Sequence, residues 1–222
     1  MPALLVYDGP VMQDRLQARQ PISVGFFVDR LATYLDQFVQ DPPYYLVGSS
    51  LGGQIVVEYA AQHPDKVAKI ALLCPSGMGS EEQLPVLDSF RHNDFEGLVA
   101  STFADRSRVH PAVVDQYRAK FASRAWRRAF FETVRGTKNH SVANQLPQIS
   151  KPALVICGEA DAIVDPEHVR KTVSGVPGFR FEMIPGCGHA PQLECPEIVH
   201  SLICDFFLGD ERQAANGELA TA

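Results

Sequence analysis

The residues most able to do chemistry lie at positions 48–52, which read GSSLG and fit the pattern Gly-x-Ser-x-Gly. A short apolar segment precedes them and a helical segment follows, which predicts Ser50 on an abrupt turn from a strand into a helix. Glycine at both flanks, Gly48 and Gly52, removes the clashes that side chains would make there. The start of the helix directs backbone N–H groups at developing negative charge. The pattern therefore indicates that Ser50 is a nucleophile.

Two further residues could complete an acid–base system with Ser50. Asp161 follows the apolar segment 153–159, and His189 lies in the loop after the segment 179–184. If these segments are parallel strands, their carboxyl ends lie along the edge of the sheet where ligands gather. The chain order of serine, acid and histidine is that of a hydrolase triad on such a sheet. Asp165 is the alternative acid, although its place before Pro166 also fits a helix N-cap.

The elements that must position these residues alternate between strand and helix. Apolar segments predict strands at 2–8, 44–47, 67–74, 153–159 and 179–184. Helical periodicity predicts a helix after Ser23, which is a plausible N-cap, a second helix from the GSSLG turn to about His63, and a third over 196–208. This alternation predicts an α/β fold in which helical crossovers join parallel strands.

Residues 77–150 interrupt the alternation, because they show helical periodicity and no convincing strand. We predict a helical insertion over one edge of the sheet. Between 118 and 138 a single acid, Glu132, stands against many basic residues: Arg118, Lys120, Arg124, Arg127, Arg128, Arg135 and Lys138. A solvated helix face is the simpler interpretation. The alternative is a basic lip that attracts anionic substrates or contacts an anionic lipid surface.

These patterns divide the chain into four parts. Residues 1–76 form the first part of the α/β core, with the Ser50 turn, and 77–150 form the insertion. Residues 151–208 form the second part of the core, with the acid and histidine loops. Residues 209–222 are small and polar and are expected to be a flexible tail.

Composition narrows the classes of function. The formal charge of −6 argues against nucleic acid as the main partner. The chain has no H-E-x-x-H motif, no paired Cys-x-x-Cys and no phosphate-loop Gly-Lys-Ser/Thr, so we expect neither a metal nor a nucleotide cofactor. Five cysteines without framework spacing predict free thiols and a cytoplasmic location. No apolar run is long enough for a membrane span and no signal peptide is recognisable, which leaves peripheral contact as the alternative.

Three segments together resemble the α/β-hydrolase superfamily, in its lidded branch of esterases, lipases and carbon–carbon bond hydrolases. They read LVGSSLGG at 46–53, ALVICGEADAIVD at 153–165 and IPGCGHAPQLECPE at 184–197. The resemblance implies a mostly parallel sheet flanked by helices, with the insertion as a lid.

The resemblance also implies roles for individual residues. Ser50 attacks a carbonyl carbon, His189 transfers the proton and Asp161 orients the imidazole. The N–H of Leu51 donates to the oxyanion. Expected substrate contacts under the lid are Met78, Trp126 and Phe130. Cys187, close to the histidine, is either a reactive thiol or, more simply, a small packed side chain.

The chain departs from the family pattern before the GSSLG turn. Members normally carry a third strand and a His-Gly loop that supplies a second oxyanion donor, whereas the first strand here resembles the fourth strand of the family. Either the sequence is a shortened version of a longer protein, or its first strand pairs with the strand before Ser50 in a smaller sheet.

Three functions follow from these patterns. The leading hypothesis is a serine hydrolase that cleaves carboxylic esters of small molecules through an acyl-enzyme. The second is a carbon–carbon bond hydrolase on the same triad, with the basic segment holding a substrate carboxylate. The third is an inactive, fold-retaining binder, which the departure from the pattern suggests.

Overall fold

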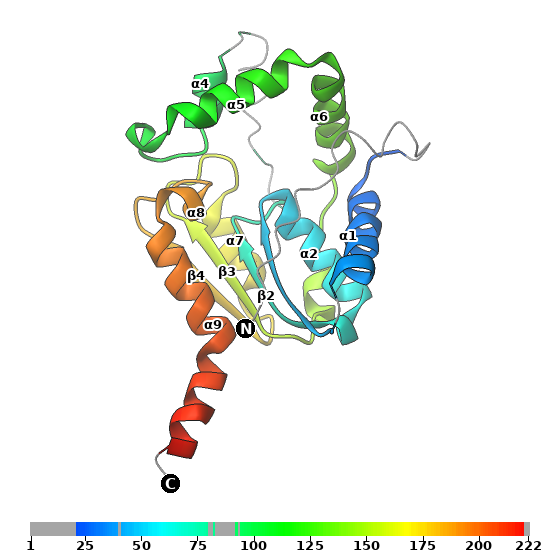
Figure 1. Cartoon of the computed structure of the whole chain (residues 1–222), viewed down its shortest axis with the longest axis vertical. Helices are drawn as coiled ribbons and strands as arrows, with labels where there is room; N and C mark the ends of the chain where they lie inside the picture. Colours follow the sequence, from blue (N-terminus) through cyan, green and yellow to red (C-terminus); the bar gives the residue numbers. More distant parts are fainter. Residues whose placement is uncertain (1–20, 40, 80–81, 83–91, 93, 220–222) are drawn as a thin grey trace.

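A computed structural model describes residues 21–39, 41–79, 82, 92 and 94–219, and from 210 to 219 it describes the backbone only (Figure 1). The strand predicted at 2–8 lies outside the described residues. Every other predicted strand is present within a residue or two of its expected bounds. The predicted helix after Ser23 is also present. The Ser23 hydroxyl caps this helix by accepting a hydrogen bond from the N–H of Phe26 at 3.1 Å, as predicted.

Four parallel strands form one sheet in the order β1-β2-β3-β4. Their bounds are β1 (Tyr44–Ser49), β2 (Val67–Leu73), β3 (Ala153–Gly158) and β4 (Phe179–Ile184). Every residue of β3 is buried, as expected for a strand covered on both faces. Because all four strands run the same way, the loops that follow them leave the sheet along a single edge.

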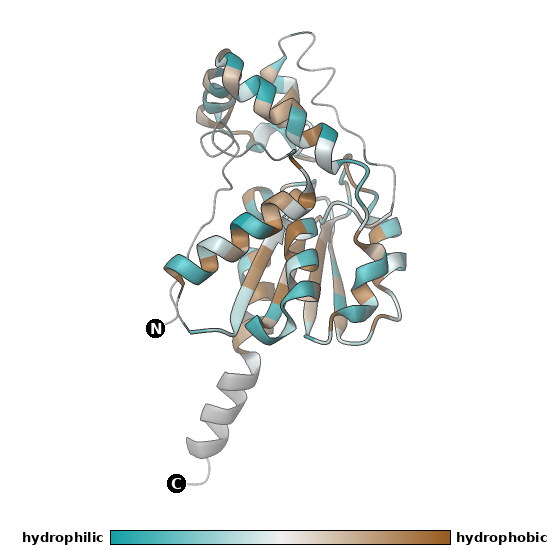
Figure 2. Ribbon diagram, turned by 90° about the vertical axis from the view of Figure 1, so that its right-hand side faces the viewer, coloured by the Kyte–Doolittle hydropathy of each residue, from teal (hydrophilic) through white to brown (hydrophobic). Residues whose placement is uncertain are grey.

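Helices cover both faces of this sheet. One face packs against α1 (Val24–Phe38), α2 (Leu51–Gln62) and α7 (Pro166–Val173), and the other packs against α9 (Pro196–Leu219) (Figure 1). In Figure 2 the strands are mostly brown and the helices alternate between brown and teal. Apolar residues of these helices belong to the same core clusters as the strands. Helix α9 continues to Leu219, whereas the sequence pattern predicts its end at Leu208. Among the described residues, no helix has the length and hydropathy that crossing a membrane requires.

The segment between β2 and β3 is helical, and its described part contains no strand. It consists of α4 (Phe95–Ala100), the 3-10 turn η3 (Arg106–Arg108), α5 (Pro111–Ala122), α6 (Arg124–Thr137) and the 3-10 helix η4 (Ala143–Gln148). Figure 1 shows α4, α5 and α6 beyond the carboxyl ends of the strands. Two exposed basic side chains bond to acids of their own helices: Arg118 to Asp115 at 2.5 Å in α5, and Arg128 to Glu132 at 2.9 Å in α6. These bonds favour the solvated-face interpretation.

The helical segment returns to the sheet along α2. The buried carboxylate of Glu58 lies 2.6 Å from Nε2 of His140, through its Oε2 atom. The side-chain amide of Gln54, also buried, donates to the carbonyl of His140. These contacts fix the connection between α6 and η4 to the helix that follows Ser50.

Two buried tyrosines of this core, Tyr59 and Tyr44, allow a matched test of how a hydroxyl hydrogen bond affects stability. Tyr59 is fully buried, and burial raises its pKa to about 12; its hydroxyl has no hydrogen-bond partner among the described residues. The Tyr44 hydroxyl donates to the carbonyl of Val39 at 3.1 Å. We expect Tyr59→Phe to raise the free energy of unfolding by about 1 kcal/mol and Tyr44→Phe to lower it by about 1 kcal/mol. Urea denaturation of both variants measures this, and a destabilised Tyr59→Phe would contradict it.

Candidate active site

Ser50 lies on a strained turn between β1 and α2. Its backbone has φ 52° and ψ −120°, a conformation that residues other than glycine rarely adopt. The turn is held from both sides, because the Ser50 N–H donates to the carbonyl of Leu73 at 2.9 Å. The Ser50 carbonyl accepts from Gly53 N–H at 2.9 Å and from Ser76 N–H at 3.1 Å. This backbone raises the hydroxyl above the end of β1.

Of the two glycines predicted to be required at the turn, Gly48 is confirmed and Gly52 is not. A Cβ atom at Gly48 would lie 2.4 Å from the carbonyl oxygen of Gly52, so a larger residue cannot fit there. A Cβ atom at Gly52 would meet nothing within 4 Å, so the prediction that both flanks require glycine is wrong for Gly52. The second tight position is Gly53, where a Cβ atom would lie 2.8 Å from Cβ of Pro75. The first turn of α2 therefore packs against the loop after β2 through Gly53.

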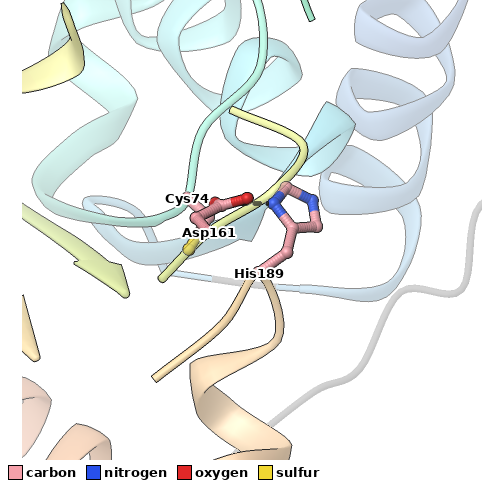
Figure 3. A group of neighbouring side chains, drawn as sticks. All are labelled: Cys74, Asp161 and His189. Carbon is pink, nitrogen blue, oxygen red and sulfur yellow. Dashed lines mark hydrogen bonds and ion pairs between the residues drawn. The ribbon is translucent and has the colours of Figure 1, made fainter. Parts of the chain in front are cut away.

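The structure brings the three predicted residues together at the carboxyl edge of the sheet. His189 Nε2 lies 3.0 Å from Ser50 Oγ, and His189 Nδ1 lies 2.8 Å from Asp161 Oδ2. The second carboxylate oxygen of Asp161 accepts from the N–H groups of Ile163 and Val164 at 2.8 and 3.0 Å. Figure 3 shows the Asp161 carboxylate pointing at one ring nitrogen of His189. The Asp161 side chain is fully buried and that of His189 nearly so.

The alternative acid, Asp165, is directed elsewhere. Its carboxylate accepts hydrogen bonds from the N–H groups of Glu167 and His168 and caps α7. Its side chain thus has the N-cap role that its position before Pro166 predicts, and the contact with His189 is made by Asp161.

Two polar residues beside Ser50 were not singled out from the sequence. Ser76 Oγ lies 3.3 Å from Ser50 Oγ, and Gln192 Nε2 donates to Ser49 Oγ at 3.3 Å. The buried Oε1 atom of Gln192 has no partner among the described residues. Ser76 follows β2, so the convergence of parallel strand ends could have suggested it. Gln192 has no comparable signal, because its contact depends on how the histidine loop folds back.

Cys74 lies beside this group and raises the question of a metal. Ligand atoms of Cys74, Asp161 and His189 lie within 4.8 Å of one another (Figure 3). However, both nitrogens of His189 already face Ser50 and Asp161. A hydrogen bond with Cys157 and burial raise the pKa of the Cys74 thiol, which opposes the thiolate that a metal requires. The donor set is therefore better suited to a hydrogen-bonded triad. All five cysteines are free, as predicted.

The three predicted substrate contacts lie in packed surroundings. Met78 is almost fully buried in the main core. Trp126 and Phe130 stack at a centroid distance of 5.2 Å, within an aromatic cluster of the helical segment. Their contact with a substrate stays a prediction. A cavity of about 450 Å³ lies between α4 and α5, and its lining includes Asp94, Arg106 and Arg118 but none of the residues predicted to act on a substrate.

A family model described as the alpha/beta hydrolase fold matches residues 17–196, which is most of the chain. The chain belongs to the α/β-hydrolase fold family. The fold class predicted from the three motif segments is therefore confirmed.

Relatives within the α/β-hydrolase fold family are named as hydrolases. The chain is 26% identical over 198 residues to monoacylglycerol lipase abhd6-B of Xenopus laevis, covering 78% of this chain and 58% of that protein. It thus spans about three fifths of the length of that curated relative. Among solved structures, a serine hydrolase from Cycloclasticus zankles superposes with a TM-score of 0.77 at 20% identity, covering 87% of this chain and 75% of the other. The meta-cleavage product hydrolase CumD superposes with a TM-score of 0.76 at 16% identity, covering 86% and 73%.

Substitution of the glycines tests the geometry of the turn. We expect Gly48→Ala to lower the free energy of unfolding by at least about 2 kcal/mol, because the new methyl group overlaps the backbone of Gly52. Gly52→Ala is the matched control and should leave stability unchanged or raise it by up to about 1 kcal/mol, since alanine favours the helix. Thermal and urea denaturation of both proteins measure the difference. Equal effects of the two substitutions would contradict the turn described here.

Proposed function

We propose that this protein is a serine hydrolase that cleaves carboxylic esters of small molecules through an acyl-enzyme. The observation that carries the proposal is the continuous contact from Ser50 Oγ through His189 to Asp161, at 3.0 and 2.8 Å. Several curated relatives are named as monoacylglycerol lipases, and these names support ester hydrolysis. The family itself hosts several chemistries, so the site has to carry the argument.

The contacts support a specific route for the proton. Because the Asp161 carboxylate accepts from Nδ1, that nitrogen of His189 carries the hydrogen and Nε2 is left as the acceptor. Ser50 Oγ–H then donates to Nε2, which removes the proton as Oγ attacks the carbonyl carbon. The imidazolium so formed protonates the leaving alcohol, and water releases the acyl group by the same steps. Ser76 is left as a donor to Ser50 Oγ, because the single Ser50 proton faces His189.

In this mechanism, two further features stabilise the transition state. Asp161 is held rigidly, since its other oxygen accepts two backbone N–H groups, and it can therefore fix the imidazole tautomer. Leu51 is the first residue of α2, so its N–H lies in the helix turn whose N–H groups have no intrahelical partner. We assign it as one oxyanion donor, and one such donor contributes about 3 kcal/mol to lowering the barrier.

Labelling with a fluorophosphonate tests the nucleophile. We expect the probe to modify the wild-type protein and Ser49→Ala, and to leave Ser50→Ala unmodified, because Ser50 Oγ contacts His189 Nε2 whereas Ser49 Oγ accepts from Gln192. Hydrolysis of nitrophenyl esters by Ser50→Ala should fall by about 10³-fold or more. Mass spectrometry of the labelled peptide identifies the site. Labelling of folded Ser50→Ala equal to wild type, or no labelling of folded wild type, would overturn the proposal.

A comparison of two substrate classes tests the ester assignment. We expect turnover of short-chain and medium-chain nitrophenyl esters to exceed that of a ring-fission dienoate, the substrate class of carbon–carbon bond hydrolases. Rates are measured for both classes with Ser50→Ala as the background. A preference for the dienoate by orders of magnitude would replace the ester assignment with the carbon–carbon one, and binding of either class without turnover would favour the binder.

A further inference from the structure

Glu194 is a buried acid that the proposed chemistry does not use. It ends the short helix α8 (Pro191–Glu194), and only 2% of the residue is exposed. An acidic side chain is rarely buried to this extent unless it is paired or hydrogen-bonded. Its partners therefore show what it does in the fold.

The Glu194 carboxylate joins two loops that are far apart in the sequence. Its Oε2 atom accepts from Gly188 N–H at 2.7 Å and from Ala104 N–H at 3.1 Å. Its Oε1 atom accepts from Asp105 N–H at 2.7 Å. The backbone carbonyl of Glu194 accepts in addition from the guanidinium of Arg108. One residue thus binds both the histidine loop and the connection between α4 and α5.

The residues immediately before and after His189 are both hydrogen-bonded to other parts of the chain. The residue before it, Gly188, donates to Glu194, and the residue after it, Ala190, donates to the carbonyl of Thr102 at 3.0 Å. The two loops also touch directly, because a Cβ atom at Gly188 would lie 2.6 Å from the backbone nitrogen of Ala104. The backbone that carries the imidazole is therefore fixed by the helical segment as well as by its own loop.

We propose that Glu194 is a positioning residue that holds His189 in reach of Ser50 by fastening the histidine loop to the connection between α4 and α5. The proposal rests on the proposed function, in which His189 transfers the proton. Without the carboxylate, three backbone N–H groups lose their acceptor and the two loops can separate. A shift of about 1 Å at a catalytic group is sufficient to slow a reaction by about 100-fold.

A role confined to folding would have different consequences. A substitution that only destabilises the protein reduces the fraction folded and leaves the folded fraction with normal kcat, KM and spectra. A positioning role predicts a lower kcat per folded molecule with a nearly unchanged KM, because Glu194 affects the proton transfer and contacts no substrate. It also predicts a change in the hydrogen bond between His189 and Asp161.

Glu194→Gln is the first test, because glutamine keeps the size of the side chain and one acceptor oxygen. We expect kcat for a nitrophenyl ester to fall by roughly 10- to 100-fold with KM within about threefold of wild type. The far-downfield proton resonance of His189 Nδ1–H, assigned by its loss in His189→Ala, should broaden or shift. Glu197→Gln is the matched control, because Glu197 is an exposed acid on α9. This substitution should leave the kinetic constants and the His189 resonance unchanged.

Arg108→Ala is a second test that leaves the buried carboxylate in place. Arg108 is exposed, so its removal should not prevent folding. It contributes a single bond to the fastening, and we expect a fall in kcat of a few fold. Arg106→Ala is the control. Arg106 is an exposed arginine of the same 3-10 turn, but it lines the cavity between α4 and α5, so we expect its removal to change kcat less than the removal of Arg108 does.

The two readouts separate this inference from the proposed function. Wild-type kcat and resonance in folded Glu194→Gln would overturn the positioning role, whatever the activity of the protein. An altered resonance in Glu194→Gln, combined with a wild-type protein that cleaves no ester, would keep the positioning role and reject ester hydrolysis. Equal losses in Arg108→Ala and Arg106→Ala would contradict the fastening through Glu194.

Discussion

Ser50 has a backbone conformation that costs roughly 1–3 kcal/mol in a residue other than glycine, and in that conformation its hydroxyl lies 3.0 Å from Nε2 of His189. The turn persists because its neighbours leave it no alternative: β2 accepts its N–H, and the residues that open α2 and follow β2 donate to its carbonyl. Gly48 and Gly53 allow the approach that these bonds require. The position of the hydroxyl is thus set by the packing of α2 against the sheet.

The same edge of the sheet carries Asp161 and His189, the other two residues of the proposed triad. Parallel strands end side by side, so residues that follow β1, β3 and β4 meet although more than a hundred positions separate Ser50 from Asp161 and His189. Each is then fixed by its own loop: two backbone N–H groups hold Asp161, and Gly188 and Ala190 are tied on either side of His189. The sheet brings the residues near one another, and the loops set the final distances.

This division explains what the sequence could predict. Strand and helix order, the Ser50 turn and the three converging residues follow from short patterns, and each is recognisable because the local chemistry leaves few alternatives. The separate roles of Gly52 and Gly53 could not be read in this way, since they depend on whether Pro75 or open space lies opposite. Gln192 and Glu194 were missed for the same reason, whereas the position of Ser76 after β2 could have suggested it. The partners of Gln192 and Glu194 come from distant parts of the chain, and a glutamine or a glutamate in a polar loop has no distinguishing pattern.

The helical segment is attached at two places to the elements that carry Ser50 and His189. Its connection between α4 and α5 is bound to the histidine loop through Glu194. His140, between α6 and η4, is bound to Glu58 and Gln54 on α2, the helix that follows Ser50. The aromatic residues of the segment, by contrast, pack mainly on one another. The two attachments therefore fix the helical segment to the elements that carry Ser50 and His189. The aromatic cluster of α5 and α6 lies apart from the side chains that make these attachments, so a change of sequence within the cluster leaves the bonds of Glu194, Glu58 and Gln54 in place.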